Sequence, residues 1–114
     1  MRASDLINPG ETAVVLFTRG DLFTLSPDRT GETGNWRLDP RREPDRVVIY
    51  RRGASPTSNE LFVASYAGSR PSNEPGRSIL RLVNVTAAGT TDLNWRAFAQ
   101  ASSNPIRYID KPSP

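Results

Sequence analysis

The clearest pattern of hydrophobic and polar positions lies in the middle of the chain. Two apolar runs, residues 47–50 and 61–66, are rich in the β-branched and aromatic side chains that favour extended backbone. A polar stretch with glycine and proline, residues 53–59, separates them, which is typical of two antiparallel strands joined by a turn. We therefore predict a central hairpin with strands over residues 46–51 and 60–66.

Three other segments are also expected to be strands. Residues 12–18 form a continuous apolar run, which indicates a strand that is covered on both faces. Residues 78–85 carry apolar side chains on one face and, apart from Arg81, on the other, and the sequence Ala-Ala-Gly at 87–89 is expected to end that strand. Residues 106–109 predict a short last strand.

The segments between these strands are polar. Residues 26–35 have the composition of a loop, and their length makes them a candidate functional loop. Residues 21–25 fit neither the helical nor the strand period, so a short helix and an extended segment both stay open. Irregular arms are expected at residues 1–11 and 110–114.

One segment, residues 90–101, has a helical pattern. Thr91 or Asp92 can cap a helix, and Trp95 and Phe98 recur three residues apart on one face. We predict a helix over residues 92–101 that packs through Trp95 and Phe98.

Length and turn content then set the fold class. The 114 residues suit one domain, 1–114, and the 10 prolines and 8 glycines indicate many short elements. We predict an α+β fold: a small, curled, mostly antiparallel β-sheet or barrel with one helix near the C-terminus. A barrel is favoured because closure removes exposed sheet edges. Whether the chain is a whole protein or part of a larger multidomain protein stays open.

Composition narrows the chemistry. The chain has no cysteine and no histidine, which removes thiol nucleophiles, imidazole bases and the usual zinc ligands. We therefore expect no catalytic residues, no metal and no cofactor. A small carboxylate-dependent enzyme stays open as an alternative, although the acidic candidates show no paired spacing: Asp21, Glu32, Glu60 and Glu74.

The apolar runs also bear on location. None approaches the roughly 20 residues that span a bilayer, and the first nine residues lack the apolar stretch of a signal peptide. We expect no membrane association and a cytoplasmic location.

Positive charge is concentrated next to the central hairpin. Lys111 is the only lysine among 15 basic residues, and residues 37–52 hold six arginines against three acidic residues. A localised positive face is typical of proteins that bind polyanions, and arginine suits phosphate particularly well. A solvated charge run that is partly self-paired is the alternative.

The same region carries a family resemblance. The segments WRL at 36–38, PDRVVIY at 44–50 and LFVASYAG at 61–68 resemble the central part of the PUA-like superfamily, especially its EVE and YTH-like branch. The resemblance covers residues 33–68, and Pro44-Asp45 lacks the glycine that the family's turn usually has. It implies a PUA-like barrel that binds DNA or RNA and holds a flipped or modified base in an aromatic pocket beside a basic groove.

The resemblance also implies roles for single residues. Trp36 would stack on the base, Tyr50 or Tyr66 would form a second wall, and three cations would contact phosphates: Arg37, Arg51 and Arg52. In the structural alternative, Trp36 fills the barrel and the two tyrosines belong to the core or its rim. A third class, a module that binds a protein partner through an edge strand, is open as well, and its sign would be an apolar surface patch in place of a basic cleft.

Overall fold

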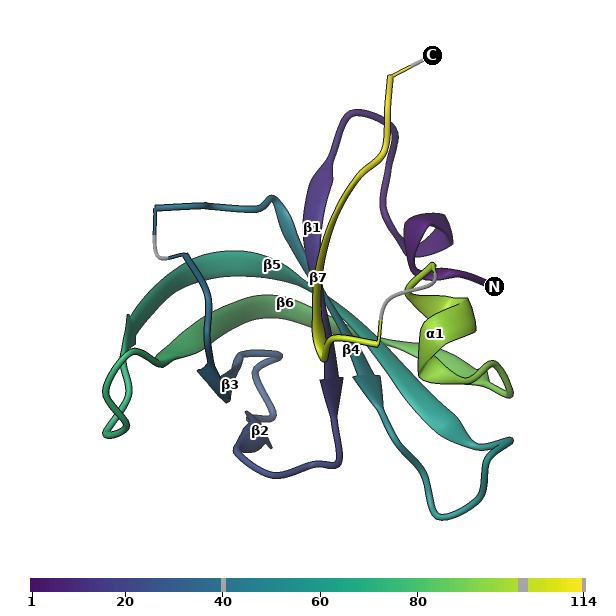
Figure 1. Ribbon diagram of the computed structural model, residues 1–114, viewed down its shortest axis with the longest axis horizontal. Helices are drawn as coiled ribbons and strands as arrows, with labels where there is room; N and C mark the ends of the chain where they lie inside the picture. The colour runs from purple at the N-terminus through teal and green to yellow at the C-terminus, as the bar shows by residue number, and fades with distance from the viewer. Residues whose placement is uncertain (40, 101–102, 114) are drawn as a thin grey trace.

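A single mixed β-sheet organises the protein. The computed structural model describes residues 1–39, 41–100 and 103–113, and within them seven strands pair in the order β2-β3-β6-β5-β4-β1-β7 (Figure 1). Every pair is antiparallel apart from the parallel pair β1–β4. The strands are β1 (Thr12–Thr18), β2 (Phe23–Leu25), β3 (Gly31–Trp36), β4 (Arg46–Arg51), β5 (Asn59–Pro71), β6 (Ser78–Thr91) and β7 (Ile106–Asp110).

Strands β1 and β4 lie inside the sheet and are covered on both faces. The middle residues of both are buried, 13–16 in β1 and 47–50 in β4. Continuous burial explains why their sequences are continuous apolar runs without polar alternation. The predicted bounds of both strands are confirmed, and so is the antiparallel pairing of β4 with β5.

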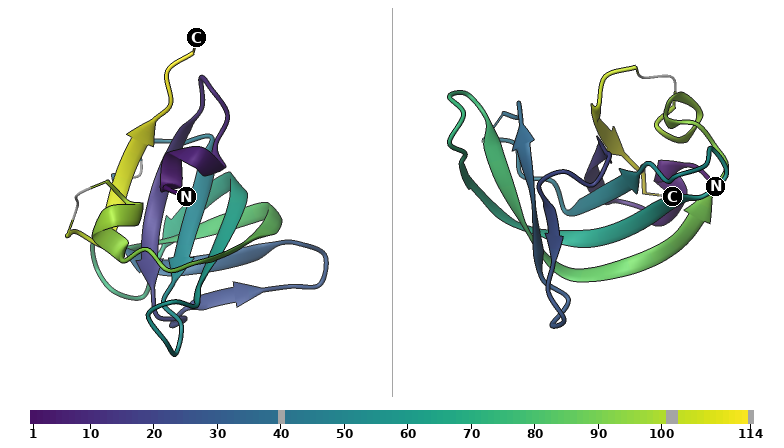
Figure 2. Two further views of the ribbon diagram at one scale, coloured as in Figure 1. Left: turned by 90° about the vertical axis from the view of Figure 1, so that its right-hand side faces the viewer. Right: turned by 90° about the horizontal axis from the view of Figure 1, so that it is seen from below.

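Strands β5 and β6 extend well beyond their predicted ends. Residues 87–89 were expected to end β6, and this prediction is wrong because Ala87 pairs with Phe62 and the strand runs on to Thr91. The β5–β6 ladder contains three register shifts. Such bulges bend a strand without ending it, and the pair sweeps across the molecule as a curved ribbon (Figure 2).

Strand β3 was not predicted, because residues 31–35 belong to the segment expected to be a loop. Their small and polar side chains carry no strand signal, yet β3 pairs with both β2 and β6. A β-carbon at Gly31 would overlap the carbonyl oxygen of Thr24, so glycine permits the close approach of β2. The open alternative at residues 21–25 is settled as an extended segment, since β2 spans Phe23–Leu25.

The helix near the C-terminus is much shorter than predicted. Helix α1 (Trp95–Phe98) is a single turn, and its N-cap is Asn94, whose Oδ1 accepts the N–H of Ala97 at 2.9 Å. The caps expected at Thr91 and Asp92 are therefore wrong, since β6 occupies the chain as far as Thr91. Residue 101, the predicted helix end, lies outside the described residues.

The N-terminal arm is more ordered than expected. It contains the 3₁₀ helix η1 (Ala3–Leu6), and the buried side chain of Ala3 belongs to the core. Lys111 Nζ donates to the carbonyl oxygens of Ser4 and Ile7, at 3.0 and 3.2 Å, which ties the C-terminal segment to η1.

Two separate cores lie on the two faces of the sheet. One includes Trp36, Phe62 and Leu80, and the other includes Tyr50, Leu61 and Phe98 under η1 and α1. The sheet is not closed: in the described part of the chain, β2 and β7 are its two edges. Helices η1 and α1 cover one face, and the curl of the sheet encloses the other, where Phe23 of β2 and Trp36 of β3 share a core with Leu16 of β1. Both cores are thus covered without the barrel closure that the sequence led us to expect.

Candidate functional site

Trp36, the predicted stacking residue, lies in the core. Its side chain is 7% exposed and packs with Leu80 and Leu82 in the same cluster. The indole Nε1 donates to Thr33 Oγ1 at 3.1 Å, which satisfies its polar atom inside the protein. This placement is the one that the structural alternative describes.

Tyr66, a predicted second wall, packs at the edge of the same core. The space between Tyr66, Arg42 and Tyr108 is about 10 Å³, which is no more than a single water molecule needs. The guanidinium of Arg42 covers the Tyr108 ring, with its Cζ 3.8 Å from the ring centroid. Trp36 and Tyr66 therefore share one core but do not line a ligand-sized hollow together.

Half of the arginines in the predicted positive face are engaged in ion pairs. The three pairs are Arg41–Asp39 at 3.2 Å, Arg46–Glu11 at 2.9 Å and Arg51–Glu60 at 2.5 Å. Arg51 also approaches the rings of Phe62 and Phe23, which fixes it against the core that contains Trp36. Among the residues that the structure describes, Arg37 and Arg52 form no ion pair.

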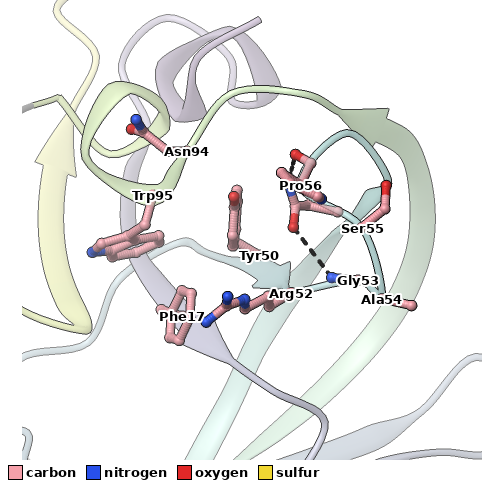
Figure 3. Close-up of a pocket in the computed structure, with 10 residues that line it drawn as sticks. Phe17, Tyr50, Arg52, Gly53, Ala54, Ser55, Pro56, Asn94 and Trp95 are labelled. Atoms are coloured by element: carbon pink, nitrogen blue, oxygen red, sulfur yellow. Dashed lines mark hydrogen bonds between the residues drawn. The ribbon is translucent and has the colours of Figure 1, made fainter.

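Two of the predicted site residues, Tyr50 and Arg52, meet on the opposite face of the sheet. They line a hollow of about 300 Å³ between α1 and the turn that joins β4 to β5 (Figure 3). We call it the aromatic hollow. Its lining residues are Phe17, Tyr50, Arg52, Gly53, Ala54, Ser55, Pro56, Asn59, Asn94 and Trp95.

Three aromatic rings form one wall of the aromatic hollow. Phe17 and Tyr50 are stacked, with centroids 5.7 Å apart and planes 25° apart, and Trp95 meets both rings edge-on at 5.7 Å. Phe17 and Trp95 are half-buried, whereas Tyr50 is 3% exposed and forms the floor. The wall therefore presents partly accessible π-faces at its rim.

The polar atoms of these rings are occupied, and their bonds fix the ring positions. Tyr50 Oη donates to the carbonyl oxygen of Leu93 at 2.7 Å, and Trp95 Nε1 donates to that of Asn104 at 2.9 Å. Burial raises the pKa of Tyr50 above its ordinary value of 10.0, and the nearby Arg52 cation only partly opposes this rise. The phenol is therefore neutral at physiological pH and acts as a donor.

The opposite wall is the turn over residues 53–58, which Asn59 holds in shape. Asn59 is 3% exposed; its Oδ1 accepts the N–H of Gly53 at 3.1 Å, and its Nδ2 donates to the carbonyl oxygens of Pro56 and Thr91 at 2.9 and 3.1 Å. A β-carbon at Gly53 would overlap the carbonyl oxygen of Ser58, so this tight turn requires glycine. One buried amide thus connects the turn to the end of β6.

Two polar groups at the aromatic hollow have no partner in the described ranges 1–39, 41–100 and 103–113. The guanidinium of the exposed Arg52 forms neither an ion pair nor a hydrogen bond, and the side-chain NH₂ of Asn94 is also without an acceptor. The site therefore combines a cation, an amide donor and aromatic rings, a set that suits a planar, anionic or hydrogen-bonding ligand.

The sequence did not single out Phe17 and Trp95 as site residues. Phe17 ends a continuous apolar run and Trp95 was assigned to the helix core, and their patterns do not differ from those of ordinary core residues. Phe98 is fully buried as expected, but the single-turn helix leaves Trp95 half-buried at the rim of the hollow. A signal existed only in the proximity of Trp95 to the polar Asn94.

The candidate carboxylates for an enzyme are mostly engaged elsewhere. Glu32 pairs with Arg70, Glu60 with Arg51 and Glu74 with Arg77. Across the described part of the chain, no group of three or more acidic side chains could hold a metal ion. In the same residues, no helix is long and apolar enough to cross a membrane.

Comparisons with known proteins do not add a relative. No family model matches the chain, and neither a curated protein nor a solved structure matches it.

Proposed function

We propose that the protein is a nucleic-acid-binding module that holds one unstacked base of a single strand in the aromatic hollow. The observation that carries this proposal is the unpaired Arg52 beside the ring cluster of Phe17, Tyr50 and Trp95. An aromatic face stacks on any base, and a guanidinium next to it binds the adjoining phosphate. Trp95 has here the stacking role that the family resemblance gave to Trp36.

The size and rigidity of the aromatic hollow support a small planar ligand. Its volume of about 300 Å³ is at the lower end of the range for ligand pockets, roughly 300–1,000 Å³. The bonds of Tyr50 and Asn59 hold the floor and the turn in place before a ligand arrives, which reduces the entropy lost on binding. Asn94 adds a donor that can reach an acceptor on the base edge, and a modified base would be read at the same point.

The balance of charges supports a limited electrostatic contribution. Because Arg41, Arg46 and Arg51 are paired with acids, the hairpin is not the broad cationic face that its composition indicates. Few phosphate contacts imply a shallow dependence of affinity on salt, with stacking contributing much of the affinity. This combination favours single strands, whose bases are accessible, over duplexes.

Fluorescence anisotropy with labelled strands of about eight nucleotides, a length in the range of single-strand binding sites, tests the proposal. We expect DNA or RNA single strands to bind more tightly than the duplex of the same sequence. Trp95→Leu should weaken binding roughly 5- to 150-fold, the equivalent of about 1–3 kcal/mol of stacking per base, without changing the salt slope.

Two matched variants make the test specific. Trp95→Phe keeps a π-face and should retain most of the affinity, whereas Arg52→Gln should lower the salt slope by about 0.7, one phosphate contact on a single strand. Wild-type protein that shows no binding to single-stranded or double-stranded DNA or RNA at low salt would overturn the proposal. Equal affinities for Trp95→Leu and Trp95→Phe would remove the stacking role.

A second candidate function, strand addition by a protein partner, has one observation in its favour. Leu22 and Leu25 are 59% and 44% exposed on either side of Phe23 at the β2 edge of the sheet. An exposed apolar edge can accept a further strand. If this edge carries the function, Leu22→Ser with Leu25→Ser should abolish partner capture and leave Trp95→Leu without effect.

A further inference from the structure

A second hollow lies on the other side of helix α1. It has a volume of about 500 Å³, is open to solvent, and is lined by Arg2, Arg96, Ala97 and Gln100. We call it the outer hollow. Figure 1 shows α1 between η1 and the turn that joins β4 to β5, so the aromatic hollow and the outer hollow lie on the same side of the molecule.

Successive residues of α1 face the two hollows. Trp95 lines the aromatic hollow, Arg96 and Ala97 line the outer hollow, and Phe98 is fully buried and anchors the turn to the core. The helix is therefore a ridge, and the two hollows are separated by about the 10–12 Å diameter of a helix with its side chains. A flexible polymer bound on one side of so narrow a ridge can continue onto the other.

The outer hollow is cationic. Arg2 and Arg96 are exposed and form no ion pair within the described residues. The acid nearest in sequence to Arg2 is Asp5, and its carboxylate accepts the backbone N–H of Arg2 at 2.7 Å. Two guanidinium groups that are not engaged in ion pairs attract a ligand that carries repeated negative charges, and a polynucleotide backbone is such a ligand.

We propose that the strand whose base occupies the aromatic hollow crosses α1, so that its neighbouring phosphates contact Arg96 and Arg2. This inference rests on the proposed function and adds a direction to it. Arg52, Trp95, Arg96 and Arg2 then form one path from the β4–β5 turn to η1. The bound polymer is a single strand, because a duplex could not bend over a ridge of one helical turn while leaving one base unstacked.

The test compares two double variants that remove the same charge. Arg2→Gln with Arg96→Gln changes the outer hollow, whereas Arg41→Gln with Arg81→Gln removes two exposed arginines that line neither the outer hollow nor the aromatic hollow. Anisotropy is measured with DNA and RNA single strands of about eight nucleotides. We expect the outer-hollow variant to bind roughly 10- to 30-fold more weakly at about 0.1 M salt, and its salt slope to fall by about 1.4.

A charge-preserving variant separates contact from folding. Arg2→Lys with Arg96→Lys should keep the salt slope of the wild type, because lysine still contacts a phosphate as a point charge. Circular dichroism on all variants checks that they are folded. Recovery of the slope in the lysine variant, together with its loss in the glutamine variant, supports the path.

The outcomes distinguish this inference from the proposed function. If Trp95→Leu weakens binding while the outer-hollow glutamine variant behaves like the Arg41/Arg81 control, the path across α1 is wrong and the aromatic hollow still binds a base. If the wild type binds no nucleic acid, both proposals are overturned. An equal loss in the two glutamine variants would indicate unspecific attraction, and it would also overturn the path.

Discussion

The turn beside the aromatic hollow depends on Asn59, and removing its side chain should destabilise the whole domain. Asn59→Ala leaves three backbone partners without their bonds: Gly53, Pro56 and Thr91. Gly53 and Pro56 lie in an exposed turn where water can replace the amide, but the bond to Thr91 is buried. A solvent-accessible bond contributes about 0.5–1.5 kcal/mol and an unsatisfied buried carbonyl costs about 1–3 kcal/mol.

The two exposed bonds and the buried carbonyl together predict a loss of about 2–6 kcal/mol in the free energy of unfolding. A chain of 114 residues unfolds with an entropy of about 0.24 kcal/mol/K, so the melting temperature should fall by about 8–25 °C. Equilibrium urea unfolding followed by tryptophan fluorescence measures the change, and an unchanged slope with denaturant would show that the unfolding reaction is the same. Ser58→Ala, in the same exposed turn, is the matched control and should change stability by less than about 0.5 kcal/mol.

Asn59→Asp gives a sharper test because its effect depends on pH. The introduced carboxylate still accepts the N–H of Gly53, but its other oxygen faces the carbonyl oxygens of Pro56 and Thr91. Burial and these carbonyls should raise its pKa in the folded state above that of the unfolded chain. The folded state then favours the protonated form, so the variant should approach wild-type stability as the pH falls and lose stability as the pH rises through the raised pKa.

If Asn59→Ala unfolds within about 0.5 kcal/mol of the wild type, the Asn59 amide does not hold the turn. The same conclusion follows if the stability difference between Asn59→Asp and the wild type is constant between neutral and acid pH.

Three further predictions concern the two cores and the N-terminal segment. Trp36→Ala should lower the free energy of unfolding by about 3–5 kcal/mol, and Trp36→Phe should lower it by less. When variants with a single tryptophan are quenched with acrylamide, the fluorescence of Trp36 should be shielded and that of Trp95 should be quenched readily. Phe98→Ala, at a fully buried position, should also lower the free energy of unfolding by about 3–5 kcal/mol, and calorimetry should show a melting temperature about 12–20 °C lower. A loss of stability no larger than that caused by a substitution at an exposed position would refute the core role of Phe98. Burial would raise the pKa of Glu11, but the N–H of Asn8 and the Arg46 guanidinium hold it below the ordinary value of 4.5. The pKa of Glu11 is therefore lower in the folded state than in the unfolded chain, and its ionised carboxylate stabilises the fold by up to about 1 kcal/mol. This stabilisation is complete above the pKa of the unfolded chain and is lost as the pH falls through the pKa of the folded state. Urea unfolding at a series of pH values should therefore show the stabilities of the wild type and Glu11→Gln converging in acid.

The sequence alone determined the central strands of this protein. The middle residues of β1 and β4 are continuous apolar runs because both strands are buried on both faces. Burial on both faces requires an apolar side chain at each successive position, so the sequence alone reveals these strands. The hairpin of β4 and β5 and the α+β class followed from the same pattern.

Tertiary structure decided the remaining elements. Strand β3 has no strand signal in its sequence and forms because β2 and β6 pair with it. Helix α1 has only one turn, Trp95–Phe98, and Asn94 caps it in place of Thr91 or Asp92. The sequence also could not predict that the sheet stays open, because whether the edge strands β2 and β7 pair depends on how the folded sheet curls and which faces other elements cover.

The candidate site shows the same division. Of the residues that the sequence proposed for the site, Tyr50 and Arg52 line the same hollow, whereas Trp36 lies in the other core. It could not place the tryptophans, because Trp36 and Trp95 have similar neighbours in the chain, and only the packing buries one and leaves the other half-buried. It also could not show that Arg51 is neutralised, since Glu60 comes beside it only when β4 and β5 pair. Side-chain exposure and ion pairing arise from contacts between distant segments, and these contacts exist only in the folded chain.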